Sequence, residues 1–269
     1  MKKLFLLLFI LIATMNNINS QEREPMVLIE TDFGNIKLKL YNETPQHRDN
    51  FLKLIREGFY KDLLFHRVIQ NFMIQGGDPN SRGAADSTRL GAGDLEYKIP
   101  AEIVYPQYYH KKGALAAART GNDVNPNKES SATQFYIVVG KKYSDKDMNK
   151  METEKIDHTK QTIYNNLQSE NKAKIKEFYS SGDLDGLAAY RQGLYAQAEV
   201  EAEKKNPRFT PEQRSDYKEI GGAPHLDREY TVFGEVLEGL DVVDKIQKVK
   251  TSGNDRPVQS VKMNITVIE

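Results

Sequence analysis

The segment Leu64–Asp78 carries the side chains best suited to chemistry. It reads Leu-Phe-His-Arg-Val-Ile-Gln-Asn-Phe-Met-Ile-Gln-Gly-Gly-Asp and sets one arginine, Arg67, among apolar residues. Phe72 lies five positions after Arg67, Met73 comes next, and Gln75 stands two beyond it. A guanidinium, an aromatic ring, a thioether and an amide can therefore converge within one strand-turn-strand unit. The guanidinium is always protonated and presents several N–H groups in a fixed fork, so it suits donation to an atom that gains a lone pair.

Two later blocks follow this segment. The second block is the run Gly-Ala-Leu-Ala-Ala-Ala-Arg-Thr at 113–120, continued by Ser-Ala-Thr-Gln-Phe-Tyr-Ile at 131–137. The third is Pro-His-Leu-Asp at 224–227, followed by Tyr-Thr-Val-Phe-Gly at 230–234.

The first segment resembles the F-H-R-x-x-x-x-F-M-x-Q-G-G-D signature of cyclophilin-type peptidyl-prolyl cis/trans isomerases. The second block is similar to the family's G-x-L-S-M-A-x-x … S-Q-F-F-I motif. The third block is similar to the last segment of the family's sequence that lines its substrate groove. The resemblance runs from about Val27 to Ile268, apart from an insertion. Three matching blocks, far apart but in family order, are hard to reconcile with chance.

The resemblance implies an enzyme that needs neither metal nor cofactor. By position it assigns Arg67 to the twisted amide, with Phe72 and Gln75 completing the catalytic set. Phe72, Met73, Tyr136 and Leu226 fall where the family lines its proline pocket. The residues expected to bind substrate are His66, Met73, Ala118, Gln134, Tyr136, His225, Leu226 and Tyr230.

An isomerase of this kind makes and breaks no bond. Rotation about X-Pro is slow because it must disrupt amide resonance, against a barrier of roughly 18 to 20 kcal/mol. As the amide twists, the prolyl nitrogen regains its lone pair, and a donor aimed at it binds the twisted state better than either planar one.

Four positions depart from the family pattern. Tyr136 stands where phenylalanine is usual and adds a hydroxyl to the pocket wall, which is expected to alter substrate preference. His225 occupies a position where many eukaryotic members have a tryptophan that contacts cyclosporin, so weak drug affinity is expected. Tyr230 replaces a common histidine, and Arg119 replaces a common asparagine.

Several residues also have plainer interpretations. Arg67 by itself would be a solvated or ion-paired surface residue, and only the full signature reverses that interpretation. Regular strand alternation puts His66 on the opposite face from Arg67, which favours a rim or structural histidine over a general base. Gly76–Asp78 lacks the lysine and hydroxyl of a phosphate loop, so turn geometry explains it better. The five histidines show no metal-ligand spacing, and no G-x-S-x-G motif supports a hydrolase.

The elements that must position these residues are mostly strands. Residues 26–41 alternate apolar and polar side chains around a turn at Asp32–Asn35, which predicts a hairpin. Thr44 and Pro45 are typical of an N-cap and first helical turn, for a helix that stops at Gly58. Another helix is expected at 237–249. Further strands are expected at about 63–69, 72–76, 114–118, 135–139, 231–236 and from Val261 to the end.

Closely spaced short strands argue for a barrel or sandwich, not for βαβ units. With the resemblance, the expectation is a mainly β fold, a closed antiparallel eight-stranded barrel capped by two helices, with a helical insertion. The insertion is expected at about 143–222, where the sequence is rich in charged residues and lacks the alternating pattern of strands. Leu184, Leu187, Tyr190, Leu194, Tyr195 and Ala198 make a helical stripe within it. Thr210 and Gln213 form a capping-box pattern at another helix start, and Gly221 marks its stop.

Composition excludes several classes of function. The chain has 38 basic and 38 acidic residues, so nothing in its charge favours nucleic acid as a partner. It has no cysteine, which excludes disulfides, thiolate metal sites and cysteine nucleophiles.

The first residues are typical of a secretory signal. Lys2 and Lys3 precede an apolar run from Leu4 to Ala13, and a polar stretch ends at Ser20. The run is about half the ~20 residues that a bilayer requires, and no later segment would span one. We therefore expect a signal peptide at 1–20 and an exported monomer at 21–269, in the periplasm or alternatively outside the cell.

The sequence thus predicts an exported isomerase of X-Pro bonds, acting on proline-containing polypeptides and unfolded client proteins. The alternative is a chaperone or scaffold that captures such chains through the same groove, with weak or no catalysis. For the insertion, a solvated helical elaboration stands against a surface that flanks the groove and holds unfolded polypeptide.

Overall fold

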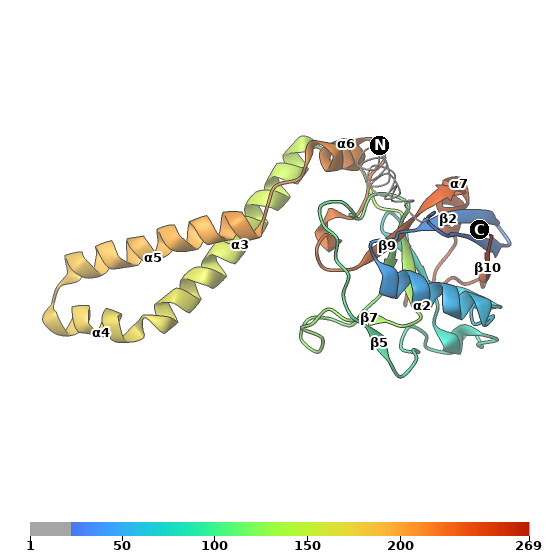
Figure 1. The fold of residues 1–269 in the computed structure, drawn as a ribbon, viewed down its shortest axis with the longest axis horizontal. Coiled ribbons are helices and arrows are strands. Elements are labelled where there is room, and N and C mark those ends of the chain that lie inside the picture. Colours follow the sequence, from blue (N-terminus) through green and yellow to red (C-terminus); the bar gives the residue numbers. More distant parts are fainter. Residues whose placement is uncertain (1–22, 269) are drawn as a thin grey trace, which may run out of the picture.

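The computed structural model describes residues 23–268, so the expected signal peptide lies outside the described residues. Within that range the chain forms a β-barrel from which a long helical arm projects (Figure 1).

Eight strands of the described chain close the barrel. Around it they run in the order β1, β10, β3, β4, β8, β6, β9 and β2, and every neighbouring pair is antiparallel. Their bounds are β1 (Met26–Thr31), β2 (Gly34–Leu40), β3 (Leu63–Ile69), β4 (Met73–Gly76), β6 (Ala114–Ala117), β8 (Phe135–Val138), β9 (Val232–Glu238) and β10 (Lys262–Val267). Two short strands, β5 (Lys98–Ile99) and β7 (Ser130–Ser131), pair separately. The expected closed eight-stranded antiparallel barrel is confirmed.

The alternation in the first hairpin decides which face points inward. Ile36, Leu38 and Leu40 are fully buried in β2, whereas the lysines between them remain partly exposed. Burying each such side chain contributes about 1.5–3 kcal/mol, and a slip by one residue would expose the whole set.

Two helices, α2 (Pro45–Arg56) and α7 (Leu240–Ile246), pack their apolar faces into the same core as the barrel strands. α2 begins at Pro45, as expected, but the predicted cap is wrong in one detail. The hydroxyl of Thr44 donates to the Tyr41 carbonyl at 3.3 Å and does not cap the helix.

α7 is shorter than the predicted 237–249. Leu237 and Glu238 continue β9, since Glu238 still pairs with Lys37 of β2 beyond a bulge at Leu237, and the chain turns at Gly239 with φ +94°. A Cβ at Gly239 would lie 2.3 Å from the Asn35 carbonyl oxygen, so the turn admits no larger residue.

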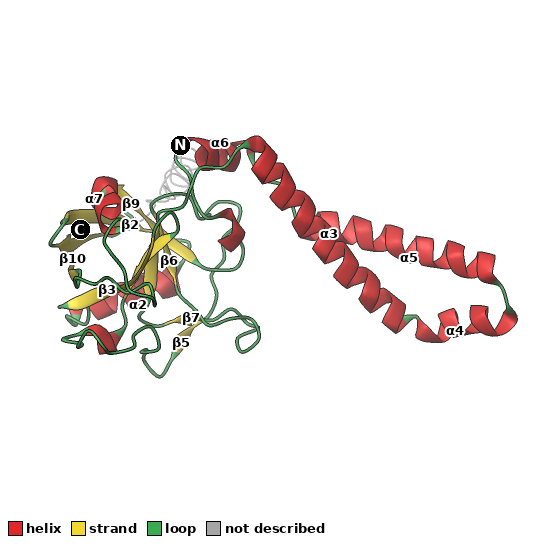
Figure 2. Cartoon of the chain, turned by 180° about the vertical axis from the view of Figure 1, so that it is seen from behind, coloured by secondary structure: helices red, strands yellow, loops and turns green. Residues whose placement is uncertain are grey.

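The arm consists of four helices. α3 (Asp145–Glu170) leads outward, α4 (Lys172–Ser181) forms the far end, α5 (Leu184–Lys205) returns beside α3, and α6 (Pro211–Glu219) lies next to the barrel (Figures 1 and 2). Ile156 and Ile163 of α3 pack against Ala198 and Ala202 of α5. The stripe of α5 that is buried contains Leu187, Leu194, Ala198 and Ala202, whereas Leu184, expected in that stripe, lies at the first turn of the helix and is 64% exposed.

The arm leaves and rejoins the barrel at one point. Gly222 donates to the Lys141 carbonyl at 3.0 Å, and Lys141 donates back at 3.2 Å. The capping box predicted at α6 is confirmed, because the Thr210 hydroxyl accepts from the backbone N–H of Gln213 while the Gln213 side chain accepts from that of Thr210. Three-residue 3-10 turns at Pro79–Ser81 and Pro224–Leu226 complete the described fold.

Candidate active site

A cavity of about 160 Å³ opens on the outer face of the barrel, where β3, β4, β6 and β8 meet the segment after the arm. It gathers residues from all three sequence blocks. The lining residues are Arg67, Phe72, Met73, Gln75, Ala118, Arg119, Tyr136, Leu226 and Tyr230. We call it the proline cavity.

Strand pairing brings the cation and the amide together. β3 and β4 are antiparallel with a bulge between Phe65 and Arg67, and the register places Arg67 opposite Gln75. Nη1 of Arg67 donates to Oε1 of Gln75 at 3.4 Å, a long hydrogen bond. The turn that follows β4 depends on Gly77, which has φ +92° and whose Cβ would lie 2.1 Å from the Thr133 carbonyl oxygen.

Arg67 remains accessible to a substrate. Its Nε donates to the Asp255 carboxylate at 3.4 Å, and the two side chains are 43% and 45% exposed. An exposed ion pair of this kind contributes about 0–1 kcal/mol, so it orients the guanidinium without immobilising it. Nη2 is engaged in neither contact and can donate into the proline cavity.

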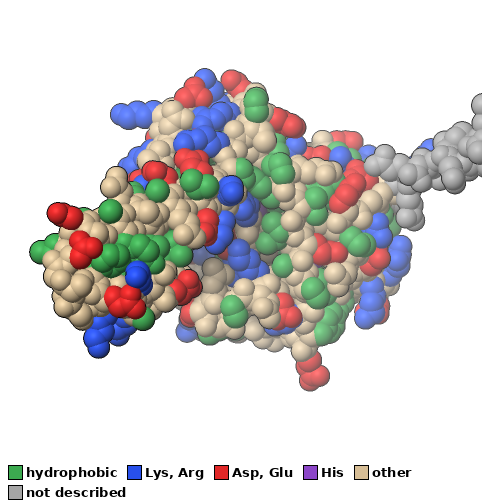
Figure 3. Space-filling model, turned by 60° about the vertical axis from the view of Figure 1, so that its left-hand side comes forward, with side chains coloured by type: hydrophobic (Ala, Val, Ile, Leu, Met, Phe, Trp, Pro, Cys, Tyr) green, Lys and Arg blue, Asp and Glu red, His purple; other side chains and the backbone are tan. Residues whose placement is uncertain are grey.

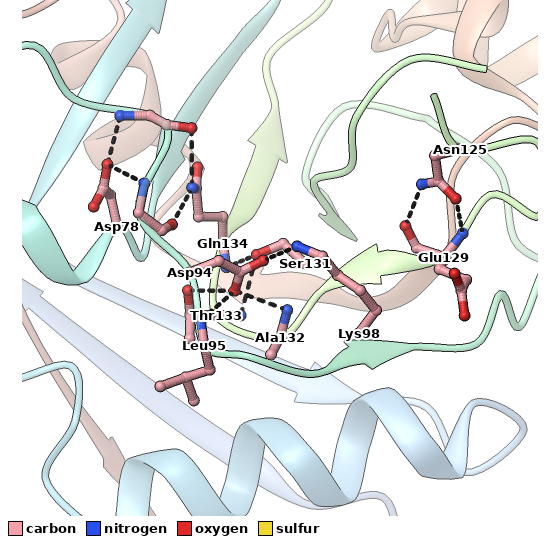
Figure 4. A network of polar contacts seen from close by, with 12 residues as sticks. Asp78, Asp94, Leu95, Lys98, Asn125, Glu129, Ser131, Ala132, Thr133 and Gln134 are labelled. Carbon is pink, nitrogen blue, oxygen red and sulfur yellow. Dashed lines mark hydrogen bonds and ion pairs between the residues drawn. The ribbon is translucent and has the colours of Figure 1, made fainter. Parts of the chain in front are cut away.

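Gln75 is held from behind by a chain of amide contacts. Its Nε2 donates to Oε1 of Gln134 at 2.9 Å, and Nε2 of Gln134 donates to the carbonyl oxygens of Gly91 and Gly93 at 3.1 and 2.6 Å. The Asp78 carboxylate accepts the backbone N–H groups of the same two glycines. Figure 4 shows the part of this network behind Gln75, in which Gln134 and Asp78 point toward one loop. The amide of Gln75 is therefore oriented before any substrate arrives.

The floor of the proline cavity is apolar and buried. Met73 and Tyr136 are 2% and 4% exposed. Phe72, Leu226 and Tyr230 are half-buried and pack against the same cluster as walls. Such a cavity can hold a small aliphatic ring beside the guanidinium and exclude water from one side of it.

The Tyr136 hydroxyl is not left unpaired under this floor. It lies 3.0 Å from Nε2 of His110, while Nδ1 of His110 lies 3.0 Å from the Asp227 carboxylate. Because a carboxylate only accepts, Nδ1 donates to Asp227, and in the neutral imidazole Nε2 accepts from the Tyr136 hydroxyl. Burial raises the pKa of Tyr136 well above its usual value, so the phenol stays protonated.

The network continues into the arm. The hydroxyl of Tyr217, on α6, donates to the second Asp227 oxygen at 2.6 Å, and Tyr217 is fully buried. A residue of the insertion thus supports the floor of the proline cavity through Asp227, His110 and Tyr136.

Three sequence-predicted site residues do not line the proline cavity. Gln134 stands behind Gln75. His225 is exposed, and its ring centroid lies 5.3 Å from that of Phe72. His66 is 3% exposed and lines a separate cavity of about 410 Å³ beside Arg67.

The bulge in β3 explains part of this placement, since His66 sits where the regular register is interrupted. Within residues 23–268 neither ring nitrogen of His66 has a hydrogen-bond partner. Burial lowers the pKa of His66 to about 4, so the ring is neutral at pH 7. The structural interpretation of His66 fits this environment better than contact with substrate.

Sequence reasoning missed the supporting residues. The sequence marks Arg119 only as a departure from the family pattern. In the structure its guanidinium lines the proline cavity, lies 4.6 Å above the Tyr230 ring and donates to the Glu229 carbonyl at 2.7 Å. Asp255 and His110 approach from loops far along the chain, and no local pattern marks them. The Pro-His-Leu-Asp block contains Asp227, but the partners of its carboxylate, His110 and Tyr217, come from other segments and are not marked by the sequence.

Comparison with known proteins shows which family this chain belongs to. The family model for cyclophilin type peptidyl-prolyl cis-trans isomerases matches residues 26–267. A Streptococcus pyogenes protein provisionally named a bifunctional phosphatase/peptidyl-prolyl cis-trans isomerase is 30% identical over 240 residues, which cover 88% of this chain and 37% of that protein. A Staphylococcus epidermidis protein provisionally named a peptidyl-prolyl cis-trans isomerase is 27% identical over 251 residues, covering 93% of this chain and 94% of its own length.

Solved structures agree in fold. A Cryptosporidium parvum cyclophilin type isomerase has a TM-score of 0.52 at 20% identity, covering 92% of this chain and 99% of that one. A second structure of that protein, determined in the presence of the dipeptide Ala-Pro, has a TM-score of 0.51.

Proposed function

Because this chain belongs to the cyclophilin-type peptidyl-prolyl cis-trans isomerases, we propose that it rotates X-Pro bonds of polypeptides that fold outside the cytoplasm, acting as a monomer. The isomerase activity itself follows from the family. The residues that perform it, the clients and the compartment are the proposed parts.

One observation carries the assignment of residues. Arg67 borders the same cavity of about 160 Å³ as the apolar side chains of Phe72, Met73 and Leu226. A proline ring seated among those side chains puts its nitrogen within reach of the guanidinium. As the amide twists, Arg67 donates to that nitrogen, and this contact is stronger in the twisted state than in either planar one.

The magnitudes show why one donor is insufficient. Raising a rate of about 0.01–0.1 per second to about 1,000 per second requires roughly 5.5–7 kcal/mol. One preorganised donor supplies roughly 2.7–4 kcal/mol by analogy with oxyanion holes. The remainder must come from seating the ring, holding the neighbouring carbonyl and excluding water.

The neighbours of Arg67 suit those tasks. Gln75, held by Gln134, presents an amide that can bind substrate backbone and keep Arg67 in place. Ala118 leaves room for the substrate polypeptide to lie along the rim of the proline cavity, and Phe72 and Tyr136 pack against the proline ring.

Exchange NMR on a short Ala-Pro peptide tests this assignment without a coupled protease. Arg67→Ala should lower kcat/KM by about 100-fold to 1,000-fold, the effect of losing one preorganised donor. Arg67→Lys should recover only part, because an ammonium keeps the charge but lacks the planar fork. Arg89→Ala is the matched control, since Arg89 is exposed nearby but does not line the proline cavity. Arg67→Ala with wild-type turnover and an intact fold would remove the proposed role.

A second function, chaperone-like binding by the arm, is favoured by its exposed apolar residues. Leu184 and Val200 of α5 are 64% and 55% exposed. A Leu184→Gln and Val200→Gln double variant should lose suppression of client aggregation while it keeps turnover of the short peptide. Unchanged suppression would show that these side chains do not bind clients.

Export is proposed from the basic and apolar pattern at residues 2–13. Fractionation followed by N-terminal sequencing should find the mature chain outside the cytoplasm and beginning at Gln21. Within residues 23–268 no helix is both long and apolar enough to cross a bilayer. Sedimentation analysis of the mature chain tests whether it is monomeric.

A further inference from the structure

A second cavity, of about 340 Å³, lies where the arm joins the barrel. Its volume falls in the range of small-ligand pockets. Its wall comes from the loop before β6, the first half of α3, the chain before α6 and the segment after it, and includes Tyr105, Met151, Lys155, Phe209, His225 and Arg228. We call it the root cavity. Figure 3 looks toward this side, with Lys and Arg side chains visible between the arm in front and the barrel behind it.

The root cavity and the proline cavity share a wall. Leu226 and Tyr230 line the proline cavity, whereas His225 and Arg228, from the same short segment, line the root cavity. The His225 ring packs on Phe72 with centroids 5.3 Å apart. A polypeptide that leaves the proline cavity across this wall therefore meets the root cavity next.

The carboxylates around the root cavity are already paired. Glu152 accepts from Arg214 at 2.7 Å and Arg208 at 3.4 Å. Asp227 accepts from His110 and Tyr217. Glu229 pairs with Arg119 and Lys128, and Glu154 with Lys150.

The two cations of the wall are not neutralised in this way. In the described part of the chain, Lys155 and the Arg228 guanidinium make no hydrogen bond or ion pair, and the guanidinium only lies 5.6 Å over the Tyr105 ring. Partial burial, followed by the nearby Arg228, lowers the pKa of Lys155, and the attraction of Glu229 and Asp227, which are already paired elsewhere, offsets this only in part. An anion between the two side chains would relieve that mutual repulsion, while Met151 and Phe209 offer apolar surface beside it.

We propose that the root cavity is a second substrate subsite, which binds the stretch of polypeptide beside the isomerised X-Pro bond and selects an acidic side chain next to an apolar one. The proposal rests on the isomerase function, because it extends the path of the same substrate. Its occupant is a polypeptide since the shared wall connects the root cavity to the site where an X-Pro bond is held.

Peptides of one length test the subsite. Each carries Ala-Pro and a glutamate, glutamine or lysine at one of the first few positions on either side, and kcat/KM is measured by exchange NMR. At one or two neighbouring positions, on one side only, glutamate should be preferred over glutamine by roughly fivefold, the scale of a partly exposed charge pair. Lysine at those positions should be the poorest.

The variants locate the preference. Lys155→Gln and Arg228→Asn should each reduce the ratio of glutamate to glutamine turnover toward one. Asparagine is chosen because Arg228 has φ +70°, a region that asparagine tolerates. Lys176→Gln, an exposed lysine of α4 at the far end of the arm, should keep the wild-type ratio.

Calorimetric binding of the same peptides is measured in parallel. The absence of a glutamate preference at every position, or a preference unchanged in the Lys155→Gln and Arg228→Asn double variant, would overturn the subsite. Failure of the isomerase assignment would show differently, as no turnover of any Ala-Pro peptide. In that case the calorimetric comparison of glutamate and glutamine peptides still decides whether the root cavity binds them.

Discussion

Replacing Tyr136 by phenylalanine should destabilise the protein, although phenylalanine is the usual residue at this position in the family that the sequence resembles. The ring would still fill the floor of the proline cavity. The hydroxyl, however, lies 3.0 Å from Nε2 of His110, and His110 is 1% exposed. Tyr136→Phe therefore leaves a buried ring nitrogen without a partner.

The magnitude follows from that burial. A buried polar atom left unsatisfied costs about 1–3 kcal/mol, so the free energy of unfolding should fall by about that amount. Turnover of a short Ala-Pro peptide should change by less than about threefold, because the apolar walls and Arg67 are untouched. Guanidinium denaturation measures the first quantity and exchange NMR the second.

Tyr217→Phe extends the test into the arm. It removes a 2.6 Å hydrogen bond to the buried Asp227 carboxylate, which is worth about 1.5–3 kcal/mol. Because both substitutions act on one network, the double variant should show a coupling energy of about 0.5 kcal/mol or more. Tyr97→Phe is the control, since its hydroxyl bonds Asn50 at the exposed surface, where water can replace it.

The reasoning would be refuted if Tyr136→Phe were as stable as wild type. It would also fail if the losses from Tyr136→Phe and Tyr217→Phe added without coupling, because the two hydroxyls would then act independently.

Three further outcomes are expected. Gly77→Ala should lower the free energy of unfolding by about 2 kcal/mol or more in denaturant titrations, because φ is +92° and the new Cβ would meet the Thr133 carbonyl; an unchanged midpoint would contradict this geometry. The pKa of His66 is about 4 in the folded state and ~6.5 in the unfolded state, so the unfolded state binds more protons between these two values. The free energy of unfolding should therefore rise by about 3 kcal/mol from pH 4 to 6.5. His66→Leu should flatten that slope. Finally, kcat/KM should be level from about pH 7 to 9, since Arg67 stays protonated and burial keeps the Tyr136 phenol neutral; a rise or fall in that range would point to a titrating group at the site.

The sequence predicted the parts of the fold whose pattern is local. Apolar and polar residues alternate along 26–40, and this alone identifies the first hairpin and its buried face. The same reasoning failed at Leu237, because an apolar residue three positions before Leu240 satisfies a helical stripe as well as a strand end. Only the pairing of Glu238 with Lys37 across the barrel decides for the strand.

In the candidate site, too, the residues that are close in sequence could be predicted and those from distant segments could not. Arg67, Phe72, Met73 and Gln75 lie on one hairpin, so their convergence could be inferred from spacing. Their supports could not. Asp255 approaches from a loop 188 positions away, and which charge finds which partner depends on how closed strands bring loops together.

The position of the arm also limits how its role can be established. Gly140 and Gly222 pass so closely that a Cβ on Gly140 would lie 2.3 Å from the backbone of Gly222, and the chain re-enters the barrel where it left. Such convergence lets a barrel tolerate a long insertion, which suggests a module that could be cut away. Tyr217 contradicts that view, because it belongs to the insertion yet donates to Asp227 beneath the proline cavity. Deleting the whole insertion would remove this donor together with the exposed apolar surface of α5. A loss of turnover would then say nothing about client binding, whereas side-chain substitutions on α5 leave the donor in place and separate the two effects.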